Sequence, residues 1–469
     1  MFDLDTINGL FGDAVTVADG RVTVSRPAVL AGPPMDQLVR AAVFAEGVER
    51  EYARWLLWEL GQAVGVQPAS IQDLYMARGR GEVSGFTVPA INLRVVTYEA
   101  ARAIFRTANA IEAGAFILEI ARSEIAYTGQ RPHEYVSVVL AAALREGFRG
   151  PVFIQGDHFQ INHKKYAVDP KTEVDAVKAL VHEAVGAGFY NIDIDTSTLV
   201  DVSKPTLAEQ QRLNIEVGVE LMKEVRGVQP PGVTIGIGGE IGEVGTQNST
   251  VEELRAYMDG LNAALPADTV GLSKVSVQSG TSHGGTVLPD GTIADVSLDI
   301  ETLRKLGEIA RSEYGMSGAV QHGASTLPDT KFHLFPQAET AEIHLATNFQ
   351  NTMYDALPDD LRQDIYAWLS TNAKDERKPT DTDEQFFYKS RKKAIGPFKQ
   401  RLWGLPDDVK QRLASEYDAK FEFLFTQLAV QGTKDAVSKY VSAPEIHRPM
   451  PTSGRAAVEA APDDADLSD

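Results

Sequence analysis

The stretch Pro151-Val152-Phe153-Ile154-Gln155-Gly156-Asp157-His158 decides the fold, because it reads as a short buried strand that ends in two polar side chains. Its apolar part favours a strand packed on both faces. Gly156 supplies a small loop residue before the aspartate and the histidine. Two more histidines lie in loops that follow strand-like runs, His283 after residues 270–277 and His322 after residues 317–320. Three histidines at strand ends, one beside an aspartate, suit a catalytic metal site with an open position.

Strand-like and helix-like patterns alternate through the middle of the chain. Strands are expected at residues 86–91, 115–120, 151–155, 190–195, 232–238, 270–277, 317–320 and 341–345. Helices are expected between most of them, at residues 98–112, 134–147, 171–187, 206–226, 250–263 and 298–314. Eight such units favour an α/β fold, a parallel sheet closed as a (β/α)8 TIM barrel. An open doubly wound sheet is the alternative, but the near-equal units favour the barrel.

The barrel pattern occupies only part of the chain, so further segments are expected at both ends. A helical block at residues 35–64, rich in Trp and Leu, is interpreted as a packing or oligomer helix, and two more helices are expected at 359–371 and 405–431. The expected organisation is an N-terminal helical extension (1–83), the catalytic barrel (84–355), a C-terminal helical extension that completes the site or an oligomer (356–442) and a disordered tail (443–469).

Composition excludes several classes of protein. The chain has no cysteine, which rules out disulfides, thiolate metal sites and a cysteine nucleophile. Any metal must therefore be held by His, Asp or Glu. The net charge of -20 argues against nucleic acid and anionic membranes as partners. The N-terminus lacks a signal-peptide pattern and no apolar run is long enough to span a membrane, so a cytoplasmic protein is expected.

The ends of parallel barrel strands converge on one mouth, which strengthens a metal role for His158, His283 and His322. Glu240 ends the fifth strand and is expected either to bind the metal or to orient a ligand histidine. Neighbouring side chains on a strand point apart, so Asp157 is expected to face the substrate and to move a proton. A turn or cap role for Asp157 is the alternative. Five other histidines lie in helical or loop contexts without a convergent partner: His133, His163, His182, His333 and His447.

Small-residue turns follow two of the three histidines, as Gly284-Gly285 and as Gly323-Ala324-Ser325-Thr326. Glycine lets backbone amides approach an anion, and Ser or Thr adds hydroxyl donors. In barrels a phosphate often lies at the loops after strands seven and eight, which here carry Ser325 and Thr347. Beside a metal site, these turns suggest a phosphorylated small substrate.

Together these motifs resemble those of the class II, zinc-dependent fructose-bisphosphate aldolase family, over about residues 84–400. The resemblance is carried by Val88-Pro89-Ala90-Ile91-Asn92, Ile154-Gln155-Gly156-Asp157-His158, the fourth-strand motif 188–197, Glu240-Ile241-Gly242, Gly280-Thr281-Ser282-His283-Gly284 and His322-Gly323-Ala324-Ser325. It implies a (β/α)8 lyase with Zn²⁺ as the cofactor, other divalent transition metals and a monovalent cation being further candidates.

The resemblance also implies roles for individual residues. The metal ligands would be His158, His283 and His322, with Glu240 as the neighbouring carboxylate. Asp157 would handle the proton of the hydroxyl next to the bond that breaks. The substrate contacts would be Asn92, Ser123, Gly284, Gly323, Ser325, His344, Thr347 and Arg391, the last one binding the second phosphate, often from a neighbouring subunit.

Two departures from the family pattern affect these roles. The family's Lys-x-Asn on strand eight is Glu342-Ile343-His344 here, which puts a glutamate near the expected phosphate. The family's mobile-loop glutamate aligns with Asn248, so Glu243, the only acidic residue of that loop, is assigned the proton at the triose carbon. Glu252 and Glu253 read as first-turn residues of the next helix.

The implied function is reversible cleavage of fructose 1,6-bisphosphate to dihydroxyacetone phosphate and glyceraldehyde 3-phosphate through a zinc-stabilised enediolate. The strand-eight departures keep an aldolase for another ketose phosphate open, such as tagatose bisphosphate or a sedoheptulose phosphate. A non-catalytic aldolase-like subunit is the second alternative. The apolar N-terminal helices and the long C-terminal segment suggest a homo-oligomer.

Overall fold

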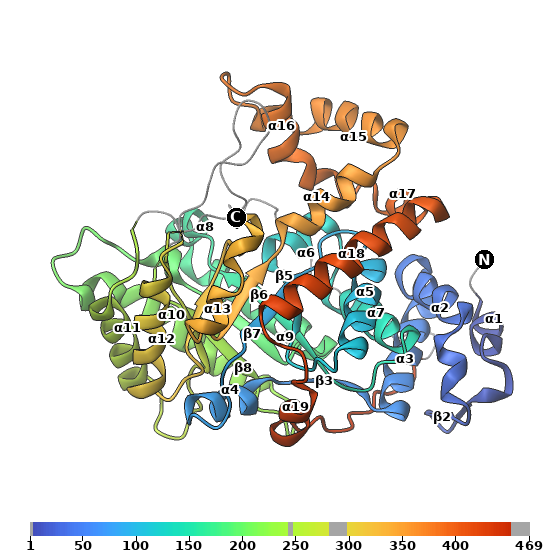
Figure 1. Ribbon diagram of the computed structural model, residues 1–469, viewed down its shortest axis with the longest axis horizontal. Coiled ribbons are helices and arrows are strands. Elements are labelled where there is room, and N and C mark those ends of the chain that lie inside the picture. Colours follow the sequence, from blue (N-terminus) through green and yellow to red (C-terminus); the bar gives the residue numbers. More distant parts are fainter. Residues whose placement is uncertain (1–2, 243–246, 281–297, 452–469) are drawn as a thin grey trace.

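A closed ring of eight parallel strands forms the centre of the computed structural model, which describes residues 3–242, 247–280 and 298–451 (Figure 1). The neighbouring strands follow the order β6-β5-β4-β11-β10-β9-β8-β7, and β7 pairs back with β6 to close the ring. The predicted (β/α)8 barrel is therefore confirmed. The strands are β4 (Val88–Asn92), β5 (Ile117–Ala121), β6 (Gly150–Gln160), β7 (Asn191–Asp195), β8 (Gly236–Glu240), β9 (Lys274–Ser276), β10 (Ala319–Gln321) and β11 (Glu342–Leu345).

Helices connect the strands at the predicted places, and their starts are set by local capping. Thr206 and Glu209 form a capping box at the start of α10, and Thr250 and Glu253 form another at the start of α11, which agrees with the first-turn role expected of Glu253. None of the described helices is long and apolar enough to cross a membrane. The helices between strands are α5 (Thr97–Ala110), α6 (Arg122–Thr128), α7 (Pro132–Arg145), α8 (His163–Val168), α9 (Pro170–Ala187), α10 (Leu207–Val228), α11 (Val251–Ala264), α12 (Ile300–Ser312) and α13 (Leu334–Gln337).

Strand β6 is longer than the other barrel strands and pairs with two different strands along one of its edges. Its first residues pair with β3 (Val66–Ala69), and its later residues pair with β7. Strand β3 comes from the N-terminal extension and was not predicted, since it is only four residues long and contains Pro68, which is rare inside strands. The extension thus contributes to the barrel sheet itself.

The N-terminal extension packs against α7 on the outside of the barrel, and its last helix reaches the end where the strands begin. The predicted helical block is two helices, α2 (Pro33–Phe44) and α3 (Gly47–Val64), and a small hairpin of β1 (Val15–Ala18) and β2 (Arg21–Val24) precedes them. Helix α4 (Gln72–Gly79) follows β3 and sends the Tyr75 hydroxyl into the barrel as a hydrogen-bond donor to Glu342. In Figure 1, β3 and α4 lie on the side of the barrel opposite to α6 and α14.

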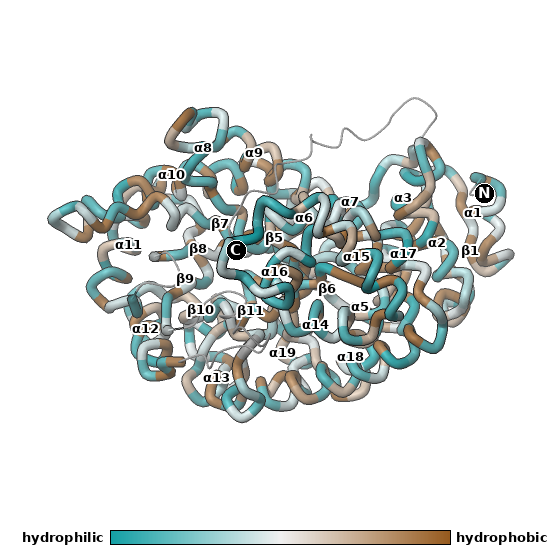
Figure 2. Tube along the Cα trace, turned by 90° about the horizontal axis from the view of Figure 1, so that it is seen from above, coloured by the Kyte–Doolittle hydropathy of each residue, from teal (hydrophilic) through white to brown (hydrophobic). Residues whose placement is uncertain are grey.

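The first of the C-terminal helices lie at the end of the barrel where the strands finish. Helices α14 and α6 follow directly after β11 and β5, and Figures 1 and 2 show α15 and α16 beyond them, with α16 over the ring of strands. Helix α18 packs along α5, and α19 returns to α4 at the opposite end. These helices are α14 (Thr347–Ala356), α15 (Asp359–Asn372), α16 (Asp383–Ser390), α17 (Lys399–Trp403), α18 (Asp407–Gln427) and α19 (Lys434–Tyr440).

The first part of the predicted disordered tail is ordered, because α3 offers it polar partners. The indole of Trp55 donates to the carbonyl of Arg448 (3.0 Å), and the indole of Trp58 donates to the carbonyl of Ile446 (2.5 Å). The Arg448 guanidinium lies 3.3 Å from the centroid of the Trp58 ring. The expectation of a disordered tail from residue 443 did not anticipate these contacts with α3. Buried Trp side chains that seek hydrogen-bond partners hold this segment in place.

Candidate metal centre

Asp157 and His158 face the same space because β6 is irregular at this point. The pairing of β6 with β7 shifts register between Gly156 and Phe159, and His158 has a φ of 40°. A non-glycine residue in this left-handed region is strained, and such strain collects at functional sites. Gly156 permits the bulge, since a Cβ there would come within 2.4 Å of the Phe159 ring. The expectation that the two side chains point apart is corrected by this bulge.

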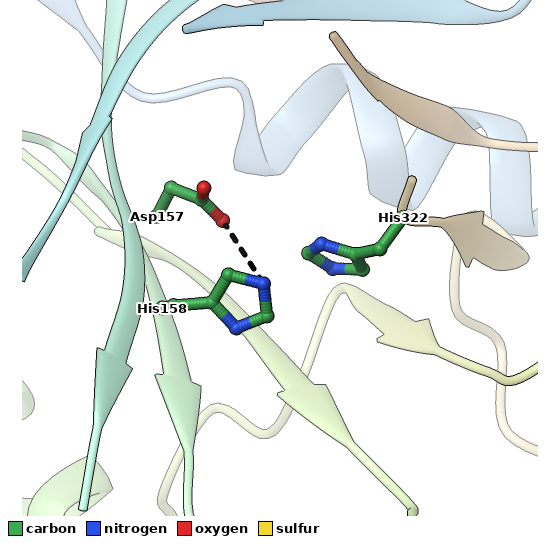
Figure 3. A group of neighbouring side chains, drawn as sticks. All are labelled: Asp157, His158 and His322. Atoms are coloured by element: carbon green, nitrogen blue, oxygen red, sulfur yellow. Dashed lines mark ion pairs between the residues drawn. The ribbon is translucent and has the colours of Figure 1, made fainter. Parts of the chain in front are cut away.

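Asp157, His158 and His322 form the first group of possible metal ligands (Figure 3). One ligand atom from each lies within 4.8 Å of the others, and the His158 Nε2 to Asp157 Oδ1 distance is 3.9 Å. The rings of His158 and His322 are 4.3 Å apart between centroids. The hydroxyl of Ser276 on β9 contacts the Nε2 of His322 at 2.9 Å. The structure thus brings together side chains from the ends of β6 and β10.

The second ring nitrogen of His158 faces two carboxylates that end neighbouring strands. Its Nδ1 lies 2.9 Å from Asp195 Oδ2 and 3.6 Å from Glu240 Oε2. Burial would raise the pKa of Asp195, but hydrogen bonds from His158 and Ser197 outweigh it and lower that pKa. An ionised Asp195 accepts a hydrogen bond from the protonated Nδ1. The Nε2 lone pair of His158 is then available to a metal. An orienting role for a carboxylate was expected of Glu240. Asp195, which was not predicted, lies nearer to Nδ1 and is better placed to orient the ring.

The residues present fit a divalent metal ion. Asp157, His322, Asp195 and Glu240 are buried and His158 is partly buried, and the five side chains offer nitrogen and oxygen ligands, the donor types that zinc and related metals take. Burial and then the charge of Asp195 raise the pKa of Glu240 well above its usual value. Burial would lower the pKa of His158, but the charge of Asp157 and the Asp195 hydrogen bond raise it. A negative potential of this kind also favours a bound cation.

A separate set of charged side chains lies deeper in the barrel, around Lys274 at the start of β9. The Lys274 ammonium donates to Gln155 (2.8 Å), Asp193 (2.9 Å) and Glu342. Burial would lower the pKa of Lys274, but the two carboxylates raise it to about 12. Burial would raise the pKa of Glu342, but Lys274 and His344 lower it to about 2. Glu342 is therefore an ion-paired core residue. The Lys274 ammonium neutralises its charge, so the carboxylate would not repel a nearby phosphate strongly.

His344 lies between the candidate metal ligands and this deeper set. Its Nδ1 is 3.0 Å from Glu119 and 3.2 Å from Asp157, and its Nε2 is 2.8 Å from Glu342. Burial would lower the pKa of His344, but the charges of Glu119 and Asp157 raise it well above the usual value. Burial and the charge of Asp157 raise the pKa of Glu119 to about 7.

Asn92 and Ser123, both predicted substrate contacts, are buried at strand ends next to this centre. The Asn92 amide nitrogen on β4 is 3.5 Å from Asp157 Oδ2. Ser123 is the second residue of α6, directly after β5. Asn92 therefore comes from the end of β4 and Ser123 from the residues that follow β5, which lies between β4 and β6 in the sheet.

The predicted phosphate loops after β10 and β11 are in contact. Gly323 has a φ of 69°, which only glycine adopts easily, and it starts a short 3-10 helix (Ala324–Thr326). The Ser325 hydroxyl accepts a hydrogen bond from the backbone amide of Ala346. Thr347 is the buried first residue of α14. A hydroxyl and a helix start thus meet at the carboxyl end of two adjacent strands.

Arg391 lies at the start of a short 3-10 helix (Arg391–Ala394) that packs against α6. Its guanidinium stacks between Tyr388 (4.3 Å) and Tyr354 (4.8 Å) and donates to the side-chain oxygen of Asn351. The contact with α6 brings this segment toward the end of β5. Its role in binding a second phosphate stays a prediction.

Three predicted site residues lie outside the described residues: His283, Gly284 and Glu243. Within the described part, sequence reasoning missed four buried charged residues of the barrel interior. These are Glu119, Asp193, Asp195 and Lys274. A charged residue inside an otherwise apolar strand was the available signal, and Asp193 and Asp195 share a face at spacing i, i+2.

Comparison with known proteins places the chain in a family. The profile of the family described as fructose-bisphosphate aldolase class-II matches residues 80–401. No curated protein matches the sequence significantly. Among solved structures, a probable tagatose 6 phosphate kinase from Sinorhizobium meliloti 1021 aligns at 15% identity with a TM-score of 0.52, over 75% of this chain and 100% of that one. Fructose-bisphosphate aldolase from Campylobacter jejuni aligns at 15% identity with a TM-score of 0.45, over 76% of this chain and 93% of that one.

Fold and site together define a (β/α)8 barrel with a cluster of His and carboxylate side chains at its mouth, placed to bind a metal. The chain belongs to the class II fructose-bisphosphate aldolase family, because the family profile covers well over half of it. The resemblance seen in the sequence is thereby confirmed. Members of this family are aldolases, generally metal-dependent, that act on phosphorylated sugars.

Proposed function

We propose that this protein is a metal-dependent aldolase that reversibly cleaves fructose 1,6-bisphosphate to dihydroxyacetone phosphate and glyceraldehyde 3-phosphate. The observation that carries the proposal is the cluster of Asp157, His158 and His322 at the mouth of a barrel whose sequence matches the aldolase profile. His158 and His322, with His283 from outside the described residues, would hold the metal, and Zn²⁺ suits these nitrogen ligands.

A metal held there would act as a Lewis acid on oxygens of the substrate. Asp157 lies beside the metal ligands and is the group placed to take the proton of the aldol hydroxyl in cleavage and to return it in condensation. Asp195 keeps His158 in one orientation through the 2.9 Å contact to Nδ1. Glu243, outside the described residues, would exchange the proton at the triose carbon.

The loops after β10 and β11 support a phosphate site in this proposal. Gly323 adopts the left-handed backbone conformation that the turn requires. Ser325 and Thr347 add hydroxyls beside the start of α14. A helix start and a small-residue turn are favourable surroundings for a phosphate. Gly284, Asn92 and Ser123 would complete the substrate contacts, and Arg391 would bind the second phosphate.

The test is cleavage of a panel of phosphorylated ketoses by purified protein, before and after chelation, with zinc added back. Fructose 1,6-bisphosphate should be cleaved with the highest kcat/KM, and chelation should abolish cleavage reversibly. Asp157→Asn is the matched variant, which should retain the metal and lose most of the cleavage. The number of subunits is measured on the same preparation by light scattering.

The strand-eight pair Glu342 and His344, which departs from the family pattern, favours a second candidate. A higher kcat/KM for tagatose bisphosphate or a sedoheptulose phosphate would replace the proposed substrate with that ketose. A protein that binds no metal and cleaves none of these sugars would contradict the enzyme assignment and favour a non-catalytic subunit.

A further inference from the structure

Strand β11 turns two charged residues into the barrel where the family pattern has a lysine and an asparagine. Glu342 and His344 share a face of the strand at spacing i, i+2. Glu342 is 0% exposed and His344 is 5% exposed. Two adjacent ionisable side chains at this depth need fixed partners, because an unpaired charge in the interior is costly.

Glu342 is held on three sides by side chains from different elements. The Nε2 of Gln155 on β6 donates to its Oε1 at 3.0 Å, and the Lys274 ammonium and the Tyr75 hydroxyl also donate to it. These donors come from β6, β9 and α4. The Glu342 carboxylate is therefore held in one position, next to the following side chain on the same face of the strand.

His344 is that residue, and its ring is fixed in three directions. The Nε2 is 2.8 Å from Glu342, the Nδ1 is 3.2 Å from Asp157, and the ring stacks on His322 with 4.0 Å between centroids and 24° between planes. The Nδ1 also lies 3.0 Å from Glu119. Neither ring nitrogen makes a hydrogen bond with any residue that the structure describes, so the ring is held by close ion-pair contacts on both sides and by stacking on His322.

We propose that His344 is a positioning residue for Asp157, holding one carboxylate oxygen while Asn92 approaches the other. This inference rests on the proposed aldolase function and adds a residue that acts through geometry. Asp157 Oδ1 faces His344 Nδ1 at 3.2 Å, and Asp157 Oδ2 faces the Asn92 amide at 3.5 Å. A carboxylate contacted at both oxygens loses rotational freedom, and fixing a proton acceptor near its substrate is a large part of its catalytic effect.

Aldol cleavage contains two separable proton transfers, and only one involves Asp157. The hydroxyl proton passes to the Asp157 carboxylate as the C–O bond becomes a carbonyl, and the C–C bond breaks with its electron pair left on the triose carbon. That carbon then takes a proton from a different acid. A residue that positions Asp157 therefore affects C–C cleavage and not the exchange of hydrogen at the triose carbon.

The experiment compares His344→Leu and His344→Gln with wild type in three measurements: cleavage of fructose 1,6-bisphosphate, exchange of the carbon-bound hydrogen of dihydroxyacetone phosphate with D₂O followed by NMR, and metal content. His344→Leu should lower kcat by ~100-fold, the lower range for a misplaced acid–base group. KM, exchange and metal content should stay close to wild type. His344→Gln keeps a donor and should recover part of kcat, and the exposed His182→Gln is the matched control.

Two results would overturn the inference while leaving the aldolase function intact. One is an unchanged kcat in His344→Leu. The other is a parallel loss of cleavage, exchange and metal, which would make His344 a support of the metal site and not of Asp157. A wild-type protein that neither cleaves the sugar nor exchanges the triose hydrogen would overturn the proposed function and the inference with it.

Discussion

The barrel interior holds two clusters of polar and charged side chains, and they differ in how their buried carboxylates are compensated. The lower cluster consists of Lys274, Glu342, Asp193, Gln155 and Tyr75, and its carboxylates share the lysine ammonium. The upper cluster consists of Asp157, His158, His322, Asp195 and Glu240, and it holds three carboxylates with two histidines. Both clusters are buried, and His344 lies between them.

This difference supports the proposal that the upper cluster is the functional part of the barrel. In the lower cluster the protein supplies its own cation, so the buried carboxylates are compensated without a ligand. In the upper cluster the carboxylates outnumber the basic groups among the described residues, which favours an external cation. Position agrees, because the upper cluster lies at the strand ends where barrel enzymes carry their sites.

The largest expected effect comes from removing a metal ligand of the upper cluster. His322→Ala should lower metal content to background and reduce aldolase activity by at least ~10³-fold, since a Lewis acid contributes several kcal/mol to the transition state. Metal analysis and a steady-state assay measure the two effects, and circular dichroism checks that the barrel remains folded. A folded variant with full metal and full activity would contradict the site assignment.

The lower cluster should respond in stability and not in metal binding. Lys274→Met leaves Glu342 and Asp193 buried without their cation, so the free energy of unfolding should fall by about 3–5 kcal/mol. Denaturant unfolding of the apo and metal-bound forms measures this loss. The double variant Lys274→Met with Glu342→Gln should recover part of it, because one of the two uncompensated carboxylates is gone. If Lys274→Met kept its stability and lost its metal, the roles assigned to the two clusters would be wrong.

A smaller effect is expected from the carboxylate behind His158. Asp195→Ala removes the 2.9 Å partner of His158 Nδ1 and should weaken zinc binding by ~10–100-fold, the range for loss of such orienting groups. Competition with a fluorescent chelator measures this affinity. Asp201→Ala, which changes an exposed aspartate of the following loop, is the matched control and should bind zinc as wild type does. Equal affinities for the two variants would remove Asp195 from the site.

The smallest effect tests how the N-terminal extension supports the lower cluster. Tyr75→Phe removes one donor to the Glu342 carboxylate and should lower the free energy of unfolding by about 1.5–3 kcal/mol, the range for a hydrogen bond to a charged group. Metal content should not change. An unchanged unfolding midpoint would mean that α4 contributes nothing to Glu342 through this contact.

The sequence predicted the barrel because strand and helix periodicities alternate regularly, and each of the eight strands lies close to its predicted place. It also indicated Asp157, His158 and His322, since strand-end histidines are visible without a structure. Strand β3 and the ordered segment around Trp58 were not predicted. Both depend on contacts between distant parts of the chain, which local periodicity does not contain.

The details of the site were less predictable. The bulge at Gly156 reverses the usual alternation of side chains, so the relation of Asp157 to His158 could not follow from strand geometry. The partners of Glu342 were also hidden, because Lys274 and Tyr75 are far from it in sequence. Register and tertiary packing, not residue type, decide which charged side chains meet inside a barrel.

The most direct test of the contrast between the clusters is a zinc titration of chelator-treated protein, with cleavage of fructose 1,6-bisphosphate followed at each addition. The account predicts that cleavage rises with zinc bound to the upper cluster, that His322→Ala loses this binding, and that Lys274→Met retains it. Cleavage at the wild-type rate in protein with no measurable metal would contradict the account.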